Sequence, residues 1–437
     1  MAESLGDKIK LLRKDLKMTQ TDLAGSEMTK SMLSQIENNI AMPSMKNLQY
    51  LASRLSKPVS YFLDSEEEQD ILPLEEVQED MKQAEALKSE GKYREASELL
   101  ELIGRKYNFV QDSKLYADYL SKFGESLIEL NDVEAGKAKV DEAIRIYESR
   151  YLYIDAAKAY LLLCGIPWNK FKYEECLAIL EQGIAIYNKS ISRDHAFEIE
   201  LLYDRAIFTA SLDRIDESIK ATEEALAMSE QTKIYYRTDD LHKNMAVINY
   251  FRGQFEGIEK HLEKARQFAE FTDNTTVMSS LEIIRAKIMN DAGKPEAAIG
   301  HLNKALTLTN RFAPPLIYTE FAKSYYLLAD YKTALEFIKK VRFPEYTPSK
   351  YDYTYVWNSR TIEGLSLLKL GRKQEALIAV REGIDKLEAV GASRFLAEAY
   401  KALSEIYSEN KEYENAFSAL KKANEIDGIV TSNGLYY

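Results

Sequence analysis

The chain has 437 residues, a net charge of −12, and only 9 prolines and 18 glycines. At about 150 residues per domain, this length exceeds one compact core and predicts two or three units, or a small domain joined to a repeat array. The scarcity of proline and glycine favours an all-α protein. No apolar run reaches the roughly 18 residues needed to cross a membrane, so we expect no membrane-spanning segment.

The charge is unevenly distributed along the chain, which bears on its partners. Residues 1–64 hold nine Lys and Arg against seven Asp and Glu, a net charge of +2, whereas residues 65–437 carry a net charge of −14. An acidic protein is not expected to coat nucleic acid without specificity. We therefore expect any contact with DNA to lie near the N-terminus.

Features of the sequence also indicate a compartment. Charged residues occur throughout residues 1–14, so we expect no signal peptide. Cys164 and Cys176 fit a reducing environment and are expected to be core residues, although they could pair. These features predict a cytoplasmic protein.

Five short helices are predicted in the first 64 residues. The first has one apolar face, formed by Leu5, Ile9, Leu12 and Leu16. Thr19 and Asp22 have the spacing of a capping box that opens a second helix through Ala24. Thr29 can cap a third helix, in which Leu33 and Ile36 are expected to face the core. A fourth helix opens at Pro43-Ser44 and is expected to bury Leu48, Leu51, Ala52 and Leu55, and a short fifth turn runs from Pro58 to Leu63. This order predicts a helix-turn-helix domain over residues 1–64.

The strings MTQTDLA at 18–24 and LSQIEN at 33–38, followed by Pro43-Ser44 and Leu48, resemble the lambda-repressor-like (XRE or Cro/C1) family over about 60 residues. The turn before Thr29 is one residue shorter than in the family, which would tilt the third helix. The resemblance implies that the third helix enters the major groove, where Lys can donate to guanine and Gln can pair with adenine, while flanking polar groups contact phosphates. The predicted DNA-binding residues are Gln20, Thr29, Lys30, Ser31, Ser34, Gln35, Asn38 and Asn39. The alternative is that they are solvated helix faces.

An acidic stretch at residues 65–76 is predicted to be a linker. Beyond it, a helix break followed by an apolar and then a small residue recurs in nine blocks that begin at residues 91, 131, 171, 213, 253, 293, 329, 371 and 411. Seven positions before each block stands a small residue: Ala84, Gly124, Cys164, Ala206, Ala246, Ala286, Ala322, Gly364 and Ser404. Small residues at this phase would let the two helices of one hairpin approach closely.

This pattern resembles tetratricopeptide repeats over residues 77–427, with a longer period than the consensus of about 34 residues. The resemblance implies a right-handed superhelix of about nine hairpins with a concave inner surface. Residues 428–437 are predicted to form a loosely packed tail. The expected fold is therefore all-α, with a helix-turn-helix domain followed by a tetratricopeptide superhelix.

The sequence contains no motif typical of a catalytic site. It lacks Cys-x-x-Cys, His-Glu-x-x-His and a glycine-rich phosphate loop, and His261 and His301 share one repeat phase, as repeat positions would. We therefore expect no enzyme, no catalytic or metal-binding residue, and no cofactor. Tyrosines at 346, 351, 353 and 355 predict either hairpin packing or a groove that grips a peptide.

The first helix of each repeat is expected to line the concave wall. An asparagine there can both donate to and accept from a peptide backbone, and charged neighbours can meet a peptide carboxylate. The predicted peptide-binding residues are Lys122, Tyr203, Asp204, Lys243, Asn244, Val247 and Lys287. The alternative is a wet interior in which any polar residue would serve.

Together, the two domains resemble the peptide-pheromone quorum-sensing regulators of the RRNPP family, and most of all its NprR and PlcR members. The resemblance implies a transcriptional regulator that binds double-stranded operator DNA, is controlled by a short signalling peptide, and forms a homodimer or a higher even oligomer. Two alternatives stay open. One is Rap-like binding or dephosphorylation of a phosphorelay response regulator, and the other is a protein-interaction scaffold that needs no peptide.

Overall fold

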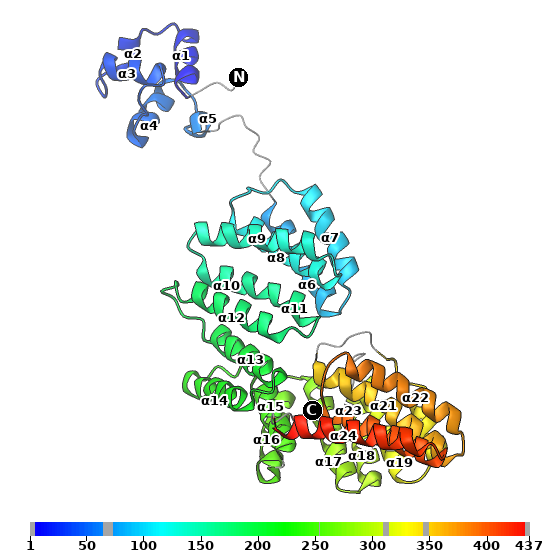
Figure 1. The fold of residues 1–437 in the computed structure, drawn as a ribbon. Coiled ribbons are helices and arrows are strands. Elements are labelled where there is room, and N and C mark those ends of the chain that lie inside the picture. Colours follow the sequence, from blue (N-terminus) through cyan, green and yellow to red (C-terminus); the bar gives the residue numbers. More distant parts are fainter. Residues whose placement is uncertain (1–4, 64–72, 253, 309–313, 344–348, 433–437) are drawn as a thin grey trace. The chain divides into compact units, whose positions relative to one another are not determined.

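The computed structural model describes residues 5–63, 73–252, 254–308, 314–343 and 349–432, and all regular elements in these ranges are helices (Figure 1). The chain divides into two compact units, residues 1–90 with 98–110 and residues 91–97 with 111–437. No helix in the described ranges combines the length and apolar character that a membrane crossing needs. The all-α prediction is confirmed.

The helix-turn-helix domain contains α1 (Leu5–Asp15), α2 (Gln20–Ala24), α3 (Lys30–Glu37), α4 (Met45–Arg54) and α5 (Ser60–Leu63). The predicted caps form as expected. Thr19 and Asp22 make the reciprocal capping box, and the hydroxyls of Thr29 and Ser44 accept from the backbone N–H groups of Met32 and Asn47, in the first turns of α3 and α4. The small core buries the predicted residues Leu33, Ile36, Leu48, Leu51, Ala52 and Leu55.

Two details of this domain follow from backbone geometry. Leu16 was predicted to be on the buried face, but its side chain is 49% exposed, because α1 ends at Asp15 and Lys17 takes a positive φ of 50° that turns the chain away. Gly25, in the tight turn after α2, has φ of 54°, and a Cβ atom there would lie 2.1 Å from the Tyr50 hydroxyl oxygen. Glycine is therefore required at this position.

The repeat array consists, in the described residues, of nine successive helix pairs. They are α6 (Leu74–Ser89) with α7 (Tyr93–Lys106), α8 (Lys114–Glu129) with α9 (Val133–Ser149), α10 (Tyr153–Leu161), η1 (Leu162–Cys164) and α11 (Gly165–Trp168) with α12 (Tyr173–Tyr187), α13 (His195–Ser211) with α14 (Ile215–Thr232), α15 (Thr238–Phe251) with α16 (Phe255–Phe271), α17 (Thr275–Asp291) with α18 (Pro295–Leu308), α19 (Pro314–Leu327) with α20 (Tyr331–Ile338), α21 (Lys350–Lys369) with α22 (Lys373–Glu388), and α23 (Arg394–Glu409) with α24 (Tyr413–Ser432). The predicted number of hairpins is thus observed.

The predicted ends of the array differ from the observed ones. Helix α6 begins at Leu74, inside the predicted linker, and its first turn carries Glu75 and Glu76, whose charges are favourable at a helix N-terminus. Residues 65–72 lie outside the described residues. Helix α24 continues to Ser432, and Val430 packs against the C-terminal core. The first five residues of the predicted tail are therefore helical, and residues 433–437 are not described.

The small residues allow close contact between the two helices of a hairpin, as predicted. A Cβ atom on Gly124 would lie 2.8 Å from the carbonyl oxygen of Gly136, and one on Gly364 would lie 3.0 Å from that of Ala376. The hydroxyl of Ser404 donates to the carbonyl oxygen of Ala416 at 2.8 Å. In each case the partner lies twelve residues further along the chain. This separation fixes the point of closest approach.

The third hairpin departs from the others. Its first helix breaks into α10, a 3-10 turn and α11, because Pro167 has no N–H to donate. The thiols of Cys164 and Cys176 are free and buried at this break, and burial raises the pKa of Cys176 to about 12. The prediction of two core cysteines is confirmed.

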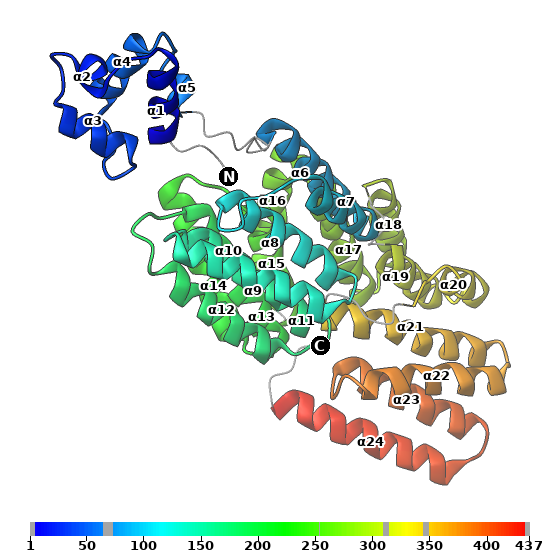
Figure 2. The same ribbon diagram turned by 90° about the horizontal axis from the view of Figure 1, so that it is seen from above.

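The third hairpin also contacts a distant part of the second unit. The ring centroids of Phe171 and Tyr353 are 5.4 Å apart. The hydroxyl oxygen of Tyr173 accepts a hydrogen bond of 3.0 Å from the backbone N–H of Lys350. The ribbon in Figure 2 shows α11 of the third hairpin near the start of α21. The start of α21 therefore lies beside the third hairpin, and the repeats between them curve around an interior.

Candidate functional site

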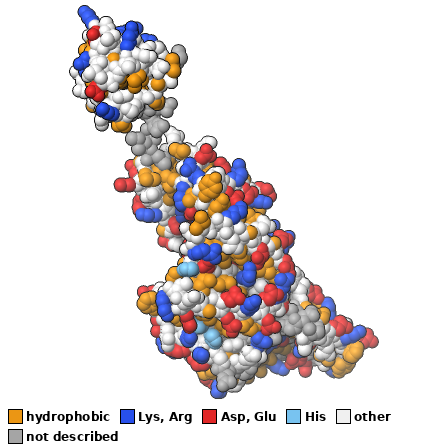
Figure 3. All heavy atoms as spheres, turned by 90° about the vertical axis from the view of Figure 1, so that its left-hand side faces the viewer, with side chains coloured by type: hydrophobic (Ala, Val, Ile, Leu, Met, Phe, Trp, Pro, Cys, Tyr) orange, Lys and Arg blue, Asp and Glu red, His pale blue; other side chains and the backbone are white. Residues whose placement is uncertain are grey.

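One face of α3 is exposed and polar. Lys30, Ser31 and Gln35 are exposed and Ser34 is half-buried, whereas Leu33 and Ile36 of the same helix face the core. Figure 3 shows several basic side chains on the surface of this domain. The side chains of these four polar residues have no partner in the part of the chain that the structure describes. They can therefore meet a ligand without first breaking an internal bond.

A buried ion pair holds this face in place. The Arg13 guanidinium binds the Glu37 carboxylate through Nε at 2.5 Å and through a second nitrogen at 2.9 Å. The Gln20 amide donates to the same carboxylate at 2.8 Å. Glu37 is 1% exposed. Burial opposes its charge, but hydrogen bonds from Arg13 and Gln20 hold the pKa of Glu37 below its ordinary value. The pair ties together α1, α2 and α3.

Four of the predicted DNA-binding residues have roles inside the domain. Gln20 binds Glu37, and Thr29 caps α3. Asn38 Oδ1 accepts from the Lys10 ammonium at 3.3 Å. Asn39 has φ of 58°, and its Oδ1 accepts from the backbone N–H of Gly6 at 3.0 Å. That these four residues contact phosphate stays a prediction. Such contacts would use the hydrogen-bonding groups of these residues that are not engaged inside the domain.

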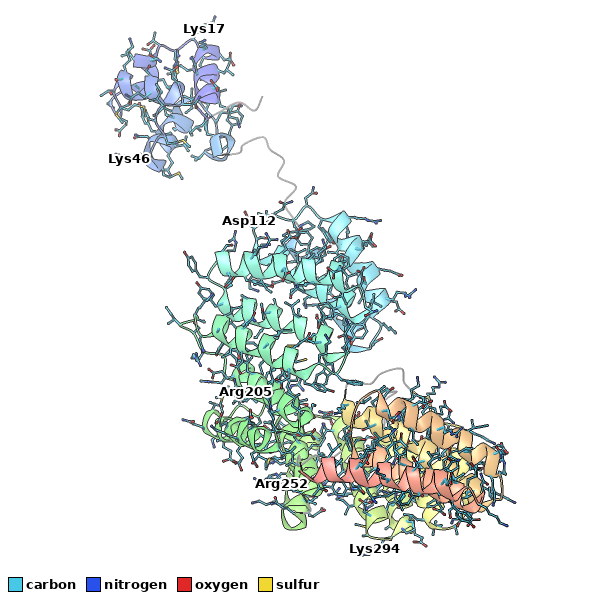
Figure 4. The ribbon with its side chains drawn as sticks, in the orientation of Figure 1. Lys17, Lys46, Asp112, Arg205, Arg252 and Lys294 are labelled. Atoms are coloured by element: carbon cyan, nitrogen blue, oxygen red, sulfur yellow. The ribbon has the colours of Figure 1, made fainter. Side chains whose placement is uncertain are left out.

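Lys46 is a candidate that the sequence analysis missed. It stands in the first turn of α4, its side chain is 84% exposed, and Figure 4 places it at the edge of the domain. A helix N-terminus is a favourable place for a phosphate, because its N–H groups and dipole attract anions. The signal was present in the sequence, since Lys46 follows the predicted cap at Ser44.

The second candidate site is a cavity of about 350 Å³ inside the second unit, called here the central cavity. It is lined by α11, α13, α15, α17, α19 and the first residues of α21. Five of the seven predicted peptide-binding residues lie in its wall, namely Tyr203, Lys243, Asn244, Val247 and Lys287. Five residues that were predicted from their spacing within the repeats, and that are far apart in the chain, therefore lie together in the structure.

Lys287 is the buried cation of this cavity. Its ammonium donates to the Tyr351 hydroxyl at 2.7 Å and lies 3.5 Å from the centre of the Tyr355 ring. Burial lowers the pKa of Lys287 to about 8, although the nearby negative charges of Glu320 and Asp352 oppose this shift. The Tyr351 hydroxyl and the Tyr355 ring thus replace part of the water that would hydrate the ammonium group of a lysine at the surface.

Opposite charges alternate along the cavity wall. The Lys243 ammonium binds the Asp240 carboxylate at 2.5 Å. Burial raises the pKa of Asp352, while the positive charges of Lys287 and Lys243 act in the other direction. Among the described residues no hydrogen bond or salt bridge holds the Asp352 carboxylate, so it is free to take a donor from a ligand.

A second cavity, of about 340 Å³ and called here the C-terminal cavity, shares Lys287 and Tyr351 with the first. Its charged residues are held by partners, as in the pair of Lys323 with Asp291 at 2.7 Å and that of Arg394 with Glu398 at 3.0 Å. The two cavities together make a continuous lining with apolar, aromatic and charged parts.

The remaining predicted residues lie elsewhere. Asp204, on α13, is outside the lining of both cavities, and burial, helped by Glu200, raises the pKa of its carboxyl to about 7. Lys122 lies on α8 and is not brought to the cavities. Of the tyrosine cluster, Tyr351 and Tyr355 line cavities and Tyr353 packs in the core, and residue 346 lies outside the described residues. A role of these tyrosines in gripping a peptide stays a prediction.

The sequence analysis missed wall residues that the repeat phase does not mark. They include Trp168, Leu316, Lys350 and Asp352. Trp168 is the last residue of the broken helix of the third hairpin, and Lys350 and Asp352 open α21 after a long connection. In the described ranges no group of three or more His, Cys, Asp or Glu residues is placed to hold a metal ion.

Comparison with known proteins gives matches to each part of the chain. Residues 9–62 match the family model described as Helix-turn-helix. The transcriptional activator NprA of Geobacillus stearothermophilus is 24% identical over 316 residues, which cover 70% of this chain and 73% of that protein.

Two solved structures share the fold of the array. The apo form of the quorum sensor NprR from B. thuringiensis aligns with a TM-score of 0.53 and 16% identity, over 80% of this chain and 99% of that one. A Rap protein complexed with Competence and Sporulation Factor aligns with a TM-score of 0.55 and 16% identity, over 83% and 100%. The chain therefore combines a helix-turn-helix domain with the helical-repeat fold found in the RRNPP regulators, the family that its sequence resembles.

Proposed function

We propose that this protein is a transcriptional regulator that binds operator DNA through α3 and is controlled by a short signalling peptide bound in the central cavity. The observation that carries the proposal is the central cavity itself, in which five residues predicted from repeat phase line one wall. The helix-turn-helix match and the relationship with the activator NprA support the DNA-binding part.

The chemistry of the cavity suits a peptide. Its volume falls in the range of about 300–1,000 Å³ typical of ligand sites. Apolar wall residues such as Val247 can bury side chains, while Asn244 can pair with a backbone amide. Asp352 and Lys287 offer one charge of each sign to the ends or side chains of a peptide. NprR is described as a quorum sensor, and the Rap protein is complexed with Competence and Sporulation Factor.

We propose a homodimer, or a higher even oligomer, as the DNA-binding form. A single helix-turn-helix buries little DNA, so two copies on a palindromic site usually supply the affinity. A regulator of this kind works in the cytoplasm and needs neither catalysis nor a cofactor.

Isothermal titration calorimetry with synthetic peptides from a small open reading frame beside the gene tests the peptide part. Saturable binding to the full chain, lost when the central cavity is blocked by Val247→Trp, supports the proposal. Binding that survives this change would move the site elsewhere. An electrophoretic shift assay with the upstream DNA, with and without peptide, tests the regulatory part.

The Rap-like alternative rests on a shared repeat fold. A phosphorelay response regulator that binds the repeats, or loses its phosphoryl group on mixing, would favour it. Deletion of residues 1–64 separates the two functions, because it removes DNA binding and leaves the repeats in place.

A further inference from the structure

A polar pocket of about 360 Å³ lies against the opposite face of α15 from the central cavity, and is called here the α15 pocket. Helix α15 lines the central cavity with residues 240, 243, 244 and 247, and the α15 pocket with Thr238 and His242. The C-terminal end of α14 and one face of α16 complete its wall.

Two buried hydroxyls in this wall lack partners. Ser229 and Thr238 are 1% and 3% exposed, and neither side-chain oxygen has a hydrogen-bond partner among the described residues. A hydroxyl that is buried without a partner destabilises the folded chain. Both residues line the pocket, so a ligand that fills it can satisfy them.

The pocket also gathers positive charge. Lys233 and Lys264 line it, and the ammonium group of neither forms a hydrogen bond or ion pair within the described ranges. Lys233 ends α14 with φ of 60°. The lining includes one carboxylate, that of the exposed Glu230, so the net charge of the wall is positive.

The N-terminus of α15 borders the pocket through Thr238, and the acidic residues of its first turn are paired. The Asp239 carboxylate accepts from the backbone N–H of Asp240 at 2.9 Å and from the Asn274 amide at 2.8 Å. The Asp240 carboxylate pairs with Lys243 at 2.5 Å. The positive charge of the pocket therefore comes from Lys233 and Lys264.

His242 supplies a further polar group. Its Nδ1 lies 3.0 Å from Nδ1 of His261, within hydrogen-bonding distance. Burial, strengthened by the nearby charges of His261 and Lys264, lowers the pKa of His242 to about 4, and the ring is neutral at pH 7. The other face of the pocket is closed by the rings of Tyr235 and Phe268, whose centroids are 5.3 Å apart.

We propose that the α15 pocket binds a small oxyanion, carried as a phosphate or carboxylate group, through Lys233 and Lys264 and the hydroxyls of Ser229 and Thr238. This site is separate from the proposed peptide site and does not depend on it. Because the two sites use opposite faces of one helix, an anion in the pocket would steady the segment that carries Lys243 and Asn244.

Calorimetry on the full chain with inorganic phosphate, and separately with succinate, tests the proposal at constant ionic strength set by chloride. Saturable binding of at least one probe is expected. Lys264→Gln should weaken it about tenfold or more, and Ser229→Ala with Thr238→Val should weaken it further. The matched control is Lys260→Gln, which removes an exposed charge from the same helix outside the pocket lining.

The outcomes separate cleanly. If phosphate binds and succinate does not, the ligand is a phosphate compound, and the reverse result indicates a carboxylate. Circular dichroism confirms that each variant is folded. No saturable binding of either probe, or equal loss in the Lys264 and Lys260 variants, overturns the proposal. The peptide titration is run on the same variants, so loss of peptide binding alone cannot be mistaken for loss of this site.

Discussion

The side-chain amide of Asn244 donates a hydrogen bond of 3.1 Å to the hydroxyl oxygen of Thr222, which lies on the preceding helix and is fully buried. The Asn244 side chain therefore has two roles: it forms part of the wall of the central cavity, and it links α15 to α14 through this hydrogen bond. Sequence alone indicated the first and gave no sign of the second.

We expect Asn244→Ala to lower peptide affinity about tenfold or more, because a peptide amide left without its partner in a buried site costs roughly 1–3 kcal/mol. The matched control is Thr222→Val, which removes the same internal hydrogen bond and does not line the cavity. Both variants should lose similar thermal stability, but only the first should lose affinity in calorimetry. Equal affinities would assign Asn244 a structural role alone.

A buried cation makes the stability of the repeats depend on pH. The pKa of Lys287 is lowered by burial from 10.5 to about 8, so the folded chain resists protonation of this group. Its unfavourable contribution is present in full below about pH 8 and disappears as the pH rises towards 10.5. We expect Lys287→Met to unfold less readily than the wild type at pH 7, by about 1–3 kcal/mol.

Denaturant unfolding of both proteins at pH 7 and pH 9.5 measures this difference. The advantage of the variant should shrink at pH 9.5. A variant that is less stable at pH 7 would mean that the contacts of Lys287 with Tyr351 and Tyr355 outweigh its burial.

The ion pair of Arg13 with Glu37 should decide the stability of the helix-turn-helix domain. Arg13→Ala leaves a buried carboxylate unpaired, which costs about 3–5 kcal/mol. Hydrogen exchange of the backbone amides in α1 to α3 measures the stability of this domain separately from that of the repeats. Because the folded-state pKa of Glu37 is lowered, its contribution is present above its ordinary value of 4.5 and is lost as the pH falls below it.

The double variant Arg13→Met with Glu37→Leu removes both charges and should recover much of the lost protection. If Arg13→Ala and the double variant exchange alike, the pair is not the cause.

Base contacts and phosphate contacts should respond differently to substitution. Lys30→Ala and Gln35→Ala are each expected to relax sequence choice, at a cost of about 1–3 kcal/mol where the contact is bidentate. Lys46→Ala should weaken all sequences alike and lower the salt slope by about one. Selection from random duplexes, followed by titration at several salt concentrations, measures both effects. Retention of operator binding after deletion of residues 1–64 would contradict the assignment.

Light scattering tests the proposed assembly. We expect a mass of two chains, or a higher even number, when peptide and DNA are present. A single chain under all conditions, with DNA bound, would refute the two-site mode of binding.

The sequence predicted the architecture well because its signals are local. Caps at Thr19, Thr29 and Ser44 and the small residues of each hairpin depend on neighbours within about a dozen positions. The same signals could not place Trp168 or Asp352 in the cavity, because these residues reach it through a broken helix and a long connection.

Roles of polar side chains were harder to predict than positions. Gln20 and Asn39 carry the residue types of phosphate contacts, yet they bind Glu37 and Gly6 inside the domain. A hydrogen bond between side chains of different helices depends on tertiary approach, which has no periodic mark in the sequence.

The twelve-residue separation between the contact points of a hairpin constrains where the array can change length. It holds for Gly124 with Gly136, Gly364 with Ala376 and Ser404 with Ala416, whereas the distance from one repeat block to the next varies between 36 and 42 residues. An insertion inside a hairpin would place a large side chain where two backbones meet. Insertions between hairpins leave every such contact unchanged, so those connections are the places at which this protein can be lengthened or tagged without loss of its fold.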